Sequence, residues 1–519
     1  MLRGIARVPV ALSTAAGCTA APSSEAPGAE AVGTASSDQA LSSAFATTMA
    51  GLAPVGWWRL GETTGTAADS SGNGHSGTYH NFLSTQRGIA GAIAGDSDGA
   101  IQVTPVASPS CANSPFVDVA DNDGFSLTRA QDSFDRSVAL GSTWGTADHG
   151  GGWTAEVTTG SFYSVDGSHA LIAETTAGTW QIGLPVSRKD ADIQVRASWS
   201  QAAVGGALTP LAIVARRIDN ANAYRAEIRE NPGGQLDLRI VKLVAGTSTV
   251  LQTATAIGTY SLHGAGTADD DWWYVRFQLE GTGLRARAWK LGTAEPTTWT
   301  VTATDSSLTA AGNVSIRSAN SGTTSLPTVA FEGFRVQSVG MTVHAFMKPT
   351  ALDFNGGNYV HWLGKGEDPQ MEWGFRFYPS SNPDRPKRVS GYIWNSTACC
   401  GFSTNEGAGA YFQDPALAAG TWYEVVVVYD PGDDLDTQAG VTIYQDGQCK
   451  SGTQCGGTPS PGVLYSNASF VVYPLNGTSP LRIGTRDCGS FFTGGLDEVA
   501  VFDRRLTAAE ISELHTQSQ

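Results

Sequence analysis

Acidic residues in short turns are the first candidates for chemistry. The stretch from Asp69 to Gly74, DSSGNG, offers side-chain oxygens at alternate positions and a glycine at the sixth, like the first half of a calcium loop. Its twelfth position is His80, where an EF-hand needs a bidentate glutamate. The loop is therefore not an EF-hand, and two interpretations stay open: a cation site, or turns shaped by side-chain hydrogen bonds of Asp69 and Asn73.

Catalytic motifs are absent or out of context. Residues 95–99, GDSDG, match the G-x-S-x-G string, but that motif works at a strand-to-helix turn of an α/β sheet, and this segment is a Gly/Asp-rich turn. No H-E-x-x-H occurs, and the E-x-D-x-x-E pattern of retaining glycosidases is missing. Asp497 and Glu498 are adjacent, so strand alternation predicts that they lie on opposite faces. Polysaccharide hydrolysis or elimination therefore remains an alternative without a motif of its own.

Aromatic residues give a clue to binding. Trp373, Phe375 and Phe377 share one face of an expected strand, and Tyr392 and Trp394 share one face of another. Rings on a concave sheet face can stack on sugars, but a packed interior needs the same spacing, so both interpretations stay open. The candidate carbohydrate-binding residues are Trp362, Trp373, Arg376, Tyr392 and Trp394.

The cysteines and the N-terminus both point to export. Ala15-Ala16-Gly17-Cys18 resembles a lipobox in which Cys18 is lipidated, and a Ser/Ala/Pro/Gly-rich tether follows. The other six cysteines suit structural disulfides of an oxidising compartment, and we expect Cys449 and Cys455 to pair across a hairpin. The disulfide candidates are Cys111, Cys399, Cys400, Cys449, Cys455 and Cys488.

Composition indicates the elements that must hold these residues. With 62 glycines and only 15% charged residues in 519, the chain suits short strands and tight turns better than long surface helices. Its length allows two or three domains. A net charge of −16 argues against nucleic acid and anionic membrane surfaces as partners.

The two ends of the chain carry a family resemblance. Trp58-Arg59-Leu60-Gly61-Glu62 and the DSSGNG turn resemble the opening of laminin-G-like jelly-roll domains. The stretch from Gly494 to Asp503 resembles the last strand of that family, and Thr507 with Glu510 predicts a capping box for a terminal helix. The resemblance implies a calcium site at Asp69, Asn73 and Asp497.

The family pattern breaks after Leu127 and resumes at Thr342, which predicts an inserted domain. The insert resembles concanavalin-like modules of actinobacterial surface proteins and of minor tail proteins of their phages. We therefore expect an all-β chain of two concanavalin/laminin-G-like jelly-roll β-sandwiches, the second inserted into the first. The expected parts are a lipoprotein signal at 1–18, a linker at 19–50, the host at 51–128 and 340–519, and the insert at 131–339.

The insert alternates apolar and polar residues along its expected strands, as in 273–280. Its arginines are expected on solvated outer faces, offset by Glu227, Asp237 and Glu280. These arginines are Arg225, Arg229, Arg239, Arg276, Arg285 and Arg287.

The expected function is non-catalytic carbohydrate binding or adhesion, assisted by Ca²⁺. The partner would be a polysaccharide or glycoconjugate, and the protein would lie outside the cell, lipid-anchored at its surface. A structural minor tail protein of an actinobacterial phage, located in the virion tail, and a polysaccharide hydrolase or lyase are the alternatives.

Overall fold

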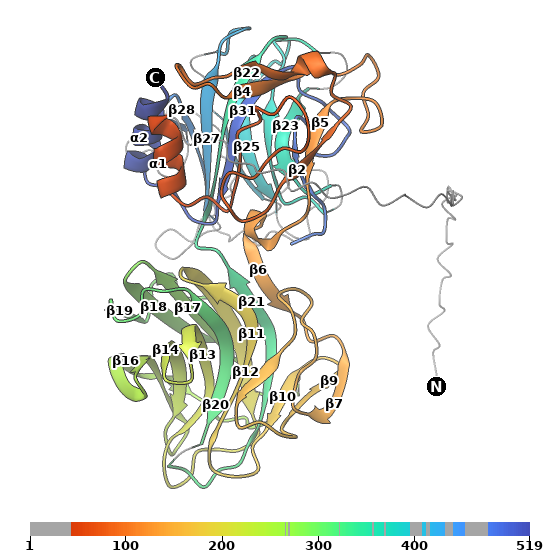
Figure 1. Ribbon diagram of the computed structural model, residues 1–519. Helices are drawn as coiled ribbons and strands as arrows, with labels where there is room; N and C mark the ends of the chain where they lie inside the picture. Colours follow the sequence, from red (N-terminus) through yellow and green to blue (C-terminus); the bar gives the residue numbers. More distant parts are fainter. Residues whose placement is uncertain are drawn as a thin grey trace, which may run out of the picture. The chain divides into compact units, whose positions relative to one another are not determined.

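The computed structural model describes residues 43–519, apart from residues 265, 268–269, 321, 355–357, 368–369, 395–406, 412–415, 431–439 and 452–475. Cys18, Cys399, Cys400 and Cys455 lie outside the described residues. Strands dominate, and they form two β-sandwiches, one nested in the sequence of the other (Figure 1). The predicted fold class is confirmed. No helix in the described part of the chain is long and apolar enough to cross a bilayer.

The first sheet of the host, the β22 sheet, joins strands from both ends of the chain. Its order is β29 (Gln448–Ser451), β28 (Gly440–Gln445), β27 (Tyr423–Asp430), β22 (Met341–Pro349), β31 (Gly494–Phe502), β4 (Gly99–Val103) and β3 (Arg87–Ala90), with β1 (Gly56–Trp58) paired to β31. The second sheet, the β24 sheet, has the order β2 (Gly77–His80), β5 (Phe116–Val119), β30 (Leu481–Ile483), β23 (Val360–Lys365), β24 (Trp373–Phe377), β25 (Val389–Trp394) and β26 (Gly407–Tyr411). Short 3₁₀ turns, η1 (Ser84–Gln86) and η2 (Asp123–Phe125), lie in the connections.

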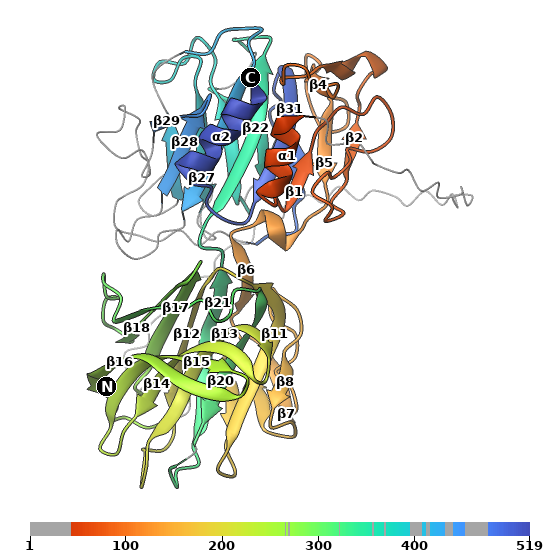
Figure 2. The same ribbon diagram turned by 60° about the vertical axis from the view of Figure 1, so that its left-hand side comes forward.

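Two helices cover the outer face of the β22 sheet, α1 (Ala44–Gly51) and α2 (Ala508–Ser518) (Figure 2). Phe45 and Met49 of α1 pack with Ile511 and Leu514 of α2 on this face. The helix α1 overlaps the end of the stretch predicted as linker, residues 19–50. A helix forms there because the apolar pair Phe45 and Met49, four residues apart, packs it against the sheet. The predicted capping box of α2 is confirmed.

The insert is a second sandwich with its own core. Its β12 sheet has the order β19 (Val301–Thr304), β18 (Gly283–Lys290), β17 (Trp273–Glu280), β12 (Ala191–Trp199), β21 (Thr328–Gln337), β10 (Ala170–Ala173), β9 (Tyr163–Asp166) and β7 (Ser137–Gly141), with β6 (Thr128–Asp132) paired to β21. Its β13 sheet has the order β16 (Thr247–Thr259), β15 (Gln235–Val244), β14 (Asn222–Glu230), β13 (Leu208–Asp219), β20 (Gly312–Ala319), β11 (Thr179–Arg188) and β8 (Thr154–Val157). The insert's strands thus run from residue 128 to residue 337, near the predicted limits of 131 and 339.

Candidate functional site

The outer face of the β24 sheet gathers aromatic and arginine side chains. On β24, Trp373, Phe375 and Phe377 point into the core between the host sheets, so the alternating Arg376 points outward. On β25, Tyr392 and Trp394 pack in a separate cluster outside that core. Tyr359 precedes β23 and also reaches Arg376. We call Tyr359, Arg376, Tyr392 and Trp394 the aromatic layer.

Arg376 lies at the centre of the aromatic layer. Its guanidinium carbon is 3.9 Å from the ring centroid of Tyr359, 4.5 Å from that of Tyr392 and 5.6 Å from that of Trp394. The rings of Tyr392 and Trp394 stack with centroids 5.8 Å apart and planes at 24°. A guanidinium within about 6 Å of a ring face is attracted by the negative charge of that face, so Arg376 and the rings hold one another in place.

Two more arginines extend the layer. Arg486 lies 5.1 Å from the Trp394 ring and forms an ion pair with Asp487 at 2.6 Å. Arg385 donates to the hydroxyl oxygens of Tyr392 at 2.7 Å and Tyr378 at 2.9 Å. The layer is therefore linked by hydrogen bonds at one end and by an ion pair at the other.

Glycines on the same face make room for these large groups. A Cβ on Gly409 would lie 2.3 Å from Tyr392 Cδ1, so the tyrosine ring needs a glycine beneath it. Gly364 and Gly374 lie under the Arg486 side chain, whose Cδ would be 3.0 Å from a Cβ on either. A larger residue at any of these positions would displace the group above it.

His361 on β23 is held neutral beside the layer. Arg376 Nε donates to His361 Nε2 at 3.1 Å, which makes Nε2 the unprotonated ring nitrogen. Burial lowers the pKa of His361 well below its usual value, and the guanidiniums of Arg486 and Arg376 lower it further. His361 therefore helps to hold Arg376 in place without adding charge to the face.

The structure separates the five predicted sugar-binding residues. Arg376, Tyr392 and Trp394 lie together on the outer face, whereas Trp362 and Trp373 pack between the two sheets. Tyr392 and Trp394 are fully covered, but Tyr359 and Arg385 are only half-buried. A ligand would therefore reach the layer at its Tyr359 and Arg385 edge.

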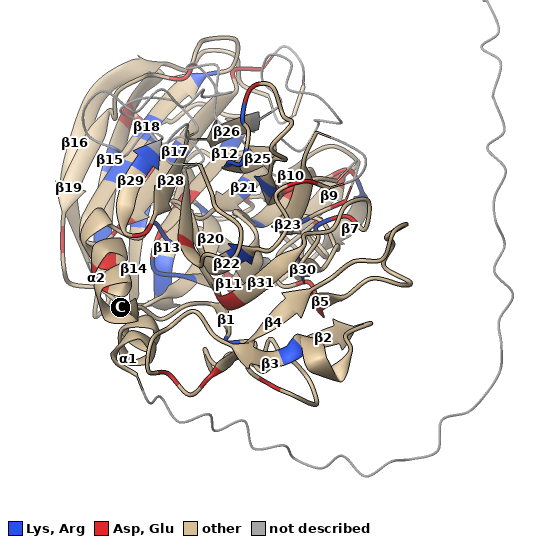
Figure 3. Ribbon diagram, turned by 90° about the horizontal axis from the view of Figure 1, so that it is seen from above, with Lys and Arg blue, Asp and Glu red and all other residues tan. Residues whose placement is uncertain are grey.

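A second feature is a buried group of carboxylates on the host's other sheet. Asp98, Asp497 and Glu498 each offer an oxygen within 4.8 Å of the others. We call them the acidic cluster; acidic residues along β31 are red in Figure 3. Both oxygens of Asp98 and Oδ1 of Asp497 are buried without a hydrogen-bond partner among the described residues. Residues 88–91 and 96–99 line an adjoining hollow of about 480 Å³.

A β-bulge brings Asp497 and Glu498 together. The β22–β31 register passes from His344 opposite Ala500 to Phe346 opposite Asp497, so two residues of β31 face one of β22. Glu498 has φ of +49° at this bulge. The prediction that the two acids lie on opposite faces is wrong, because the bulge interrupts the alternation on which it rested.

Arg59 is the cation facing the acidic cluster. It contacts Glu498 at 3.1 Å, Asp98 at 3.2 Å and the nearby Asp96 at 2.7 Å. Burial alone would lower the pKa of Arg59, but the charges of Glu498 and Asp98 outweigh burial and raise it. One guanidinium thus faces three carboxyl groups.

The shifted pKa values show how costly these charges are. Burial raises the pKa of Asp98 to about 6 and that of Glu498 to about 7, against the opposing effect of Arg59. Burial, followed by the charge of Glu498, raises the pKa of Asp497 well above its usual value. Without a further cation, the cluster therefore retains protons at a pH where exposed carboxyls have lost theirs.

The other two predicted metal ligands, Asp69 and Asn73, form hydrogen bonds to the backbone. Asp69 accepts hydrogen bonds from the backbone N–H groups of Trp57, Ser71 and His75, at 3.0, 2.9 and 2.8 Å. The Asn73 amide donates to the backbone oxygens of Pro54 and Val55. Both side chains shape the loop, and Asp497 groups with Asp98 and Glu498 instead.

Sequence reasoning missed Asp98 and Glu498 as partners of Asp497. Asp98 was present in the GDSDG turn, which immediately precedes β4, and β4 pairs with β31. Knowledge of that strand pairing would have pointed to it. The bulge at Glu498 has no comparable signal in the sequence.

Cysteine pairing is seen in part. Cys111 and Cys488 form a disulfide, and Cys449 is disulfide-bonded as well. The first bond joins host segments on either side of the insert, 377 residues apart.

The arginines of the insert differ from the expected solvated face. Arg276 and Arg287 are buried, with Trp299 over their guanidiniums at 5.8 and 4.4 Å. Glu295 pairs with both. Burial follows because an aromatic ring and a carboxylate cover the charges that were expected to face water.

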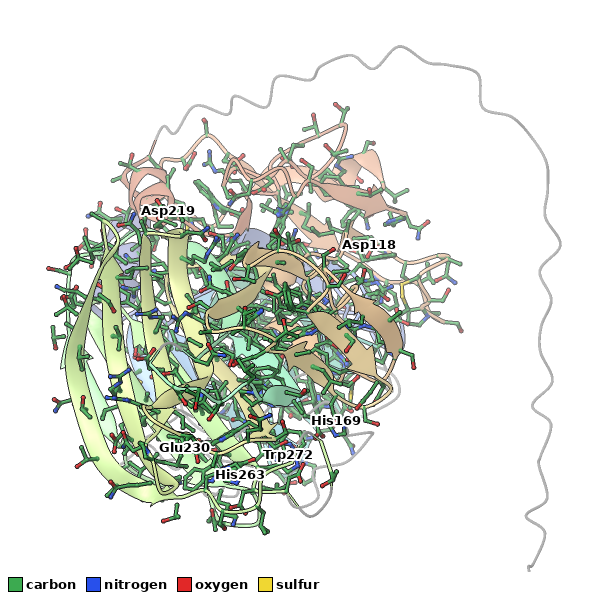
Figure 4. The ribbon with its side chains drawn as sticks, turned by 90° about the horizontal axis from the view of Figure 1, so that it is seen from below. Asp118, His169, Asp219, Glu230, His263 and Trp272 are labelled. Carbon is green, nitrogen blue, oxygen red and sulfur yellow. A yellow bond between two sulfur atoms is a disulfide. The ribbon has the colours of Figure 1, made fainter. Side chains whose placement is uncertain are left out.

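Polar groups also gather at one end of the insert, where Figure 4 shows His169 beside Trp272 and His263 beside Glu230. The rings of His169 and Trp272 stack with centroids 5.3 Å apart, and His263 Nε2 is 3.1 Å from Glu230 Oε1. Trp199 Nε1 donates to the other oxygen of Glu230 at 2.6 Å. His169, His263 and Glu230 therefore each have a partner within the insert.

Comparison with known proteins agrees with this architecture. Residues 318–512 match a family model described as the concanavalin A-like lectin/glucanases superfamily. No curated protein matches the chain. Because the match covers the second part of the host and the end of the insert, it describes a part of the chain.

Several solved structures are similar at low sequence identity. The carbohydrate-binding module CBM66 from Bacillus subtilis is 13% identical, with 40% of this chain and 97% of that one covered and a TM-score of 0.24. A putative β-glucanase from Mycobacterium abscessus is 14% identical, with 40% and 99% covered and a TM-score of 0.27. The lumenal domain of VIP36, in a Ca²⁺- and mannose-glycan-bound form, is 8% identical, with 40% and 90% covered and a TM-score of 0.28.

Proposed function

We propose that this chain is a non-catalytic carbohydrate-binding or adhesion protein that acts outside the cell. The glycan would bind at the aromatic layer of the β24 sheet. The observation that carries the proposal is Arg376 surrounded by Tyr359, Tyr392 and Trp394 on an outer sheet face. Tyr392 and Trp394 are buried in this layer, and the half-buried Tyr359 is the ring that a ligand would meet first.

The chemistry of the layer suits a sugar. Aromatic rings can stack on the apolar C–H faces of a sugar ring, and guanidiniums donate several hydrogen bonds in a fixed geometry to its hydroxyl or carboxyl oxygens. Tyr359 at the half-buried edge supplies a ring, and Arg385, which bonds to the neighbouring Tyr378, supplies donors. This combination of a few polar groups with rings is typical of ligand sites.

Binding without catalysis is favoured by the state of the neighbouring carboxyls. Glu372, just before β24, is fully buried and bonded to Lys365 and Ser126. Asp487 is paired with Arg486. Glycoside hydrolysis needs two carboxyls flanking an open groove, one of them free to give a proton, and neither of these two acids is free.

We further propose that Ca²⁺ binds the acidic cluster and stabilises the host. Carboxylate oxygens are the ligands that Ca²⁺ prefers, and the buried Oδ1 atoms of Asp98 and Asp497, which have no partner among the described residues, fit a cation. The cluster lies at β31 and β4, in the sheet that does not carry the aromatic layer. Calcium would therefore support binding through stability and would not touch the sugar.

The proposal that the protein is exported depends on its cysteines. The disulfide between Cys111 and Cys488 suits an oxidising compartment, and lipidation at Cys18 would then hold the protein at the cell surface. Radiolabelled palmitate incorporation into wild-type protein and into Cys18→Ser would test the anchor.

A glycan array probed with the purified full chain tests the function. We expect binding to a defined set of glycans in Ca²⁺, and weaker binding after chelation if the host loosens. A parallel assay for reducing ends should detect no product from the glycans that bind. Silence on every glycan with an intact fold would reject the proposal, and product release would support the hydrolase instead.

A further inference from the structure

The outer face of the insert's β13 sheet carries arginines in register. Strand pairing sets Arg239 of β15 opposite Glu227 of β14, and Ala212 of β13 lies between Glu227 and Arg317 of β20. Arg225 of β14 stands in the next outward row, opposite Val214. Neighbouring strands are about 4.8 Å apart, so the row from Arg239 to Arg317 spans about 14 Å.

These arginines converge on one carboxylate. Arg239 forms an ion pair with Glu227, and Arg225 and Arg317 each approach Oε2 of Glu227 at 3.9 Å. Arg217 of β13 pairs separately with Glu156 at 3.0 Å. We call Arg217, Arg225, Arg239 and Arg317 the arginine face.

The arginine face is positive in an acidic protein. Its four guanidiniums form direct ion pairs with two carboxylates, Glu156 and Glu227, which leaves an excess of two positive charges at contact distance in a chain that carries −16. The more distant carboxylates of Asp219 and Glu174 also attract Arg217 and Arg317. Burial, then the charge of Arg225, lowers the pKa of Arg317 to about 10. Keeping these like charges together costs stability, and the fold gains no core packing from them.

The arginines retain capacity to bind. Their side chains are 11% (Arg225), 19% (Arg239) and 14% (Arg317) exposed, so part of each side chain can be reached from solvent. The Nε atoms of Arg225 and Arg239 are buried without a hydrogen-bond partner among the described residues. An incoming oxyanion would therefore meet the exposed parts of these arginine side chains, not their Nε atoms.

Small and hydroxyl side chains lie between the arginines. Ala212, Val214 and Ser315 form the floor of the two rows together with Gly183, where a Cβ would lie 2.6 Å from Ser315 Oγ. Arg225 donates to Ser248 Oγ at 2.8 Å, and Arg317 donates to Thr179 Oγ1 at 3.2 Å. Hydroxyl groups thus border the arginines, and Ser315 donates to Glu156 Oε2 at 2.6 Å, so this carboxylate lies over part of the floor.

We propose that the arginine face is a second binding site, which takes the carboxylate or sulfate groups of an acidic polysaccharide. Guanidiniums bind such oxyanions through paired, charge-assisted hydrogen bonds. The two rows contain no aromatic residue, so they lack the platform that a neutral sugar or a protein hot spot would use. An excess of two charges is too small for the phosphate backbone of nucleic acid.

Calorimetric titration of the full chain with defined polymers tests the proposal. Heparin supplies sulfates, polygalacturonate supplies carboxylates alone, dextran is neutral, and duplex DNA supplies phosphates. We expect binding to heparin or polygalacturonate at 50 mM NaCl, weakening at higher salt because ions screen exposed charges. No binding to either acidic polymer, or tighter binding to DNA, would overturn the proposal.

Variants locate the site on the insert. The double variant Arg225→Gln/Arg317→Gln should bind at least about tenfold more weakly, since each loses a charge-assisted hydrogen bond. Arg285→Gln makes the same type of charge change on β18 of the other sheet and should leave the affinity within about twofold of wild type. Equal losses in the double variant and in Arg285→Gln would mean a general charge effect and would contradict the assignment.

A variant that is expected to bind more tightly separates loss of the site from loss of the fold. Glu227→Gln removes the internal carboxylate that competes for the guanidiniums, so a folded Glu227→Gln protein should bind the acidic polymer more tightly. Circular dichroism checks the fold of each variant. A folded double variant with wild-type affinity would place the polymer elsewhere, including the aromatic layer of the host.

Discussion

Glycan binding and calcium binding are each proposed at one cluster of host residues. In the aromatic layer, Arg376 faces three rings and holds His361 as a neutral acceptor. In the acidic cluster, Arg59 faces Asp98 and Glu498, while Asp497 keeps a buried oxygen without a partner. The first cluster can recognise a ligand, and the second can hold a cation.

Calcium should stabilise the wild-type protein and have little effect on Asp497→Asn. At a Ca²⁺ concentration about 100 times the Kd, binding to the native state alone adds about 2.7 kcal/mol, which raises the melting temperature by about 5–10 °C. Differential scanning fluorimetry in calcium and in chelator measures both proteins. In chelator, Asp497→Asn should melt no lower than wild type, because burial raises the pKa of Asp497 and disfavours its charged form, and asparagine carries no charge. A calcium shift of equal size in the variant would contradict the assignment.

The chelated protein should lose stability as the pH rises. The folded-state pKa values of Asp98 and Glu498 are raised to about 6 and about 7, so the folded state binds more protons than the unfolded state between about pH 4 and pH 7. Their contribution to stability is thus present below pH 4 and lost as the pH passes 7. Melting temperatures from pH 5 to pH 8 in chelator should fall further for wild type than for Asp98→Asn. Parallel curves would refute the shifts.

The sequence identified some site residues and missed others for clear reasons. Alternation predicts that Tyr392 and Trp394 share a face, but it does not say which face meets the core, so it cannot separate them from Trp362 and Trp373. Asp497 could be named from the strand motif. Its partners could not, since Asp98 depends on a distant strand pairing and Glu498 on a bulge.

At the scale of elements, β31 and α2 hold the end of the chain on the host. β31 lies between β22 and β4, and α2 covers their outer face next to α1. His515 of α2 adds a hydrogen bond to Glu424 of β27 at 2.8 Å, which raises the pKa of His515. The capping motif of α2 is predictable because it is local, whereas α1 has only a short apolar face, so the composition of this stretch predicts a linker.

Removing the cap of α2 should weaken the host. Thr507 accepts a hydrogen bond from the Glu510 backbone N–H, and losing an N-cap of this kind costs about 1 kcal/mol. Thr507→Ala should therefore lower the urea midpoint of the host transition, followed by tryptophan fluorescence. Thr516→Ala, an exposed change within the same helix, serves as the control and should alter the midpoint much less. Equal effects would show that the cap adds nothing beyond helix propensity.

At the scale of the whole molecule, the nesting of one sandwich in another is the main feature. The host sheets use strands from both sides of the insert, and the Cys111–Cys488 disulfide joins the same two sides. The break in the host motif made this topology predictable. The limits of the insert are harder to predict, because β6 at 128–132 continues directly from the host's residues and composition does not change there.

The insert should fold without its host. Its core residues form a cluster separate from those of the host, and its two sheets contain only strands between residues 128 and 337. A fragment of residues 127–339 should give a strand-rich circular dichroism spectrum and a single sharp melting transition. A fragment that binds hydrophobic dye and melts without cooperativity would show that the insert depends on the host.

The most direct test of the central claim is calorimetric titration of the best array glycan into wild type and Arg376→Gln, both in calcium. Wild type should bind, and Arg376→Gln should bind at least about tenfold more weakly, because it loses charge-assisted hydrogen bonds and the group that orders the rings. Arg335→Gln on β21 of the insert controls for the change in charge and should bind as wild type does. Wild-type affinity in a folded Arg376→Gln protein would contradict glycan binding at the aromatic layer.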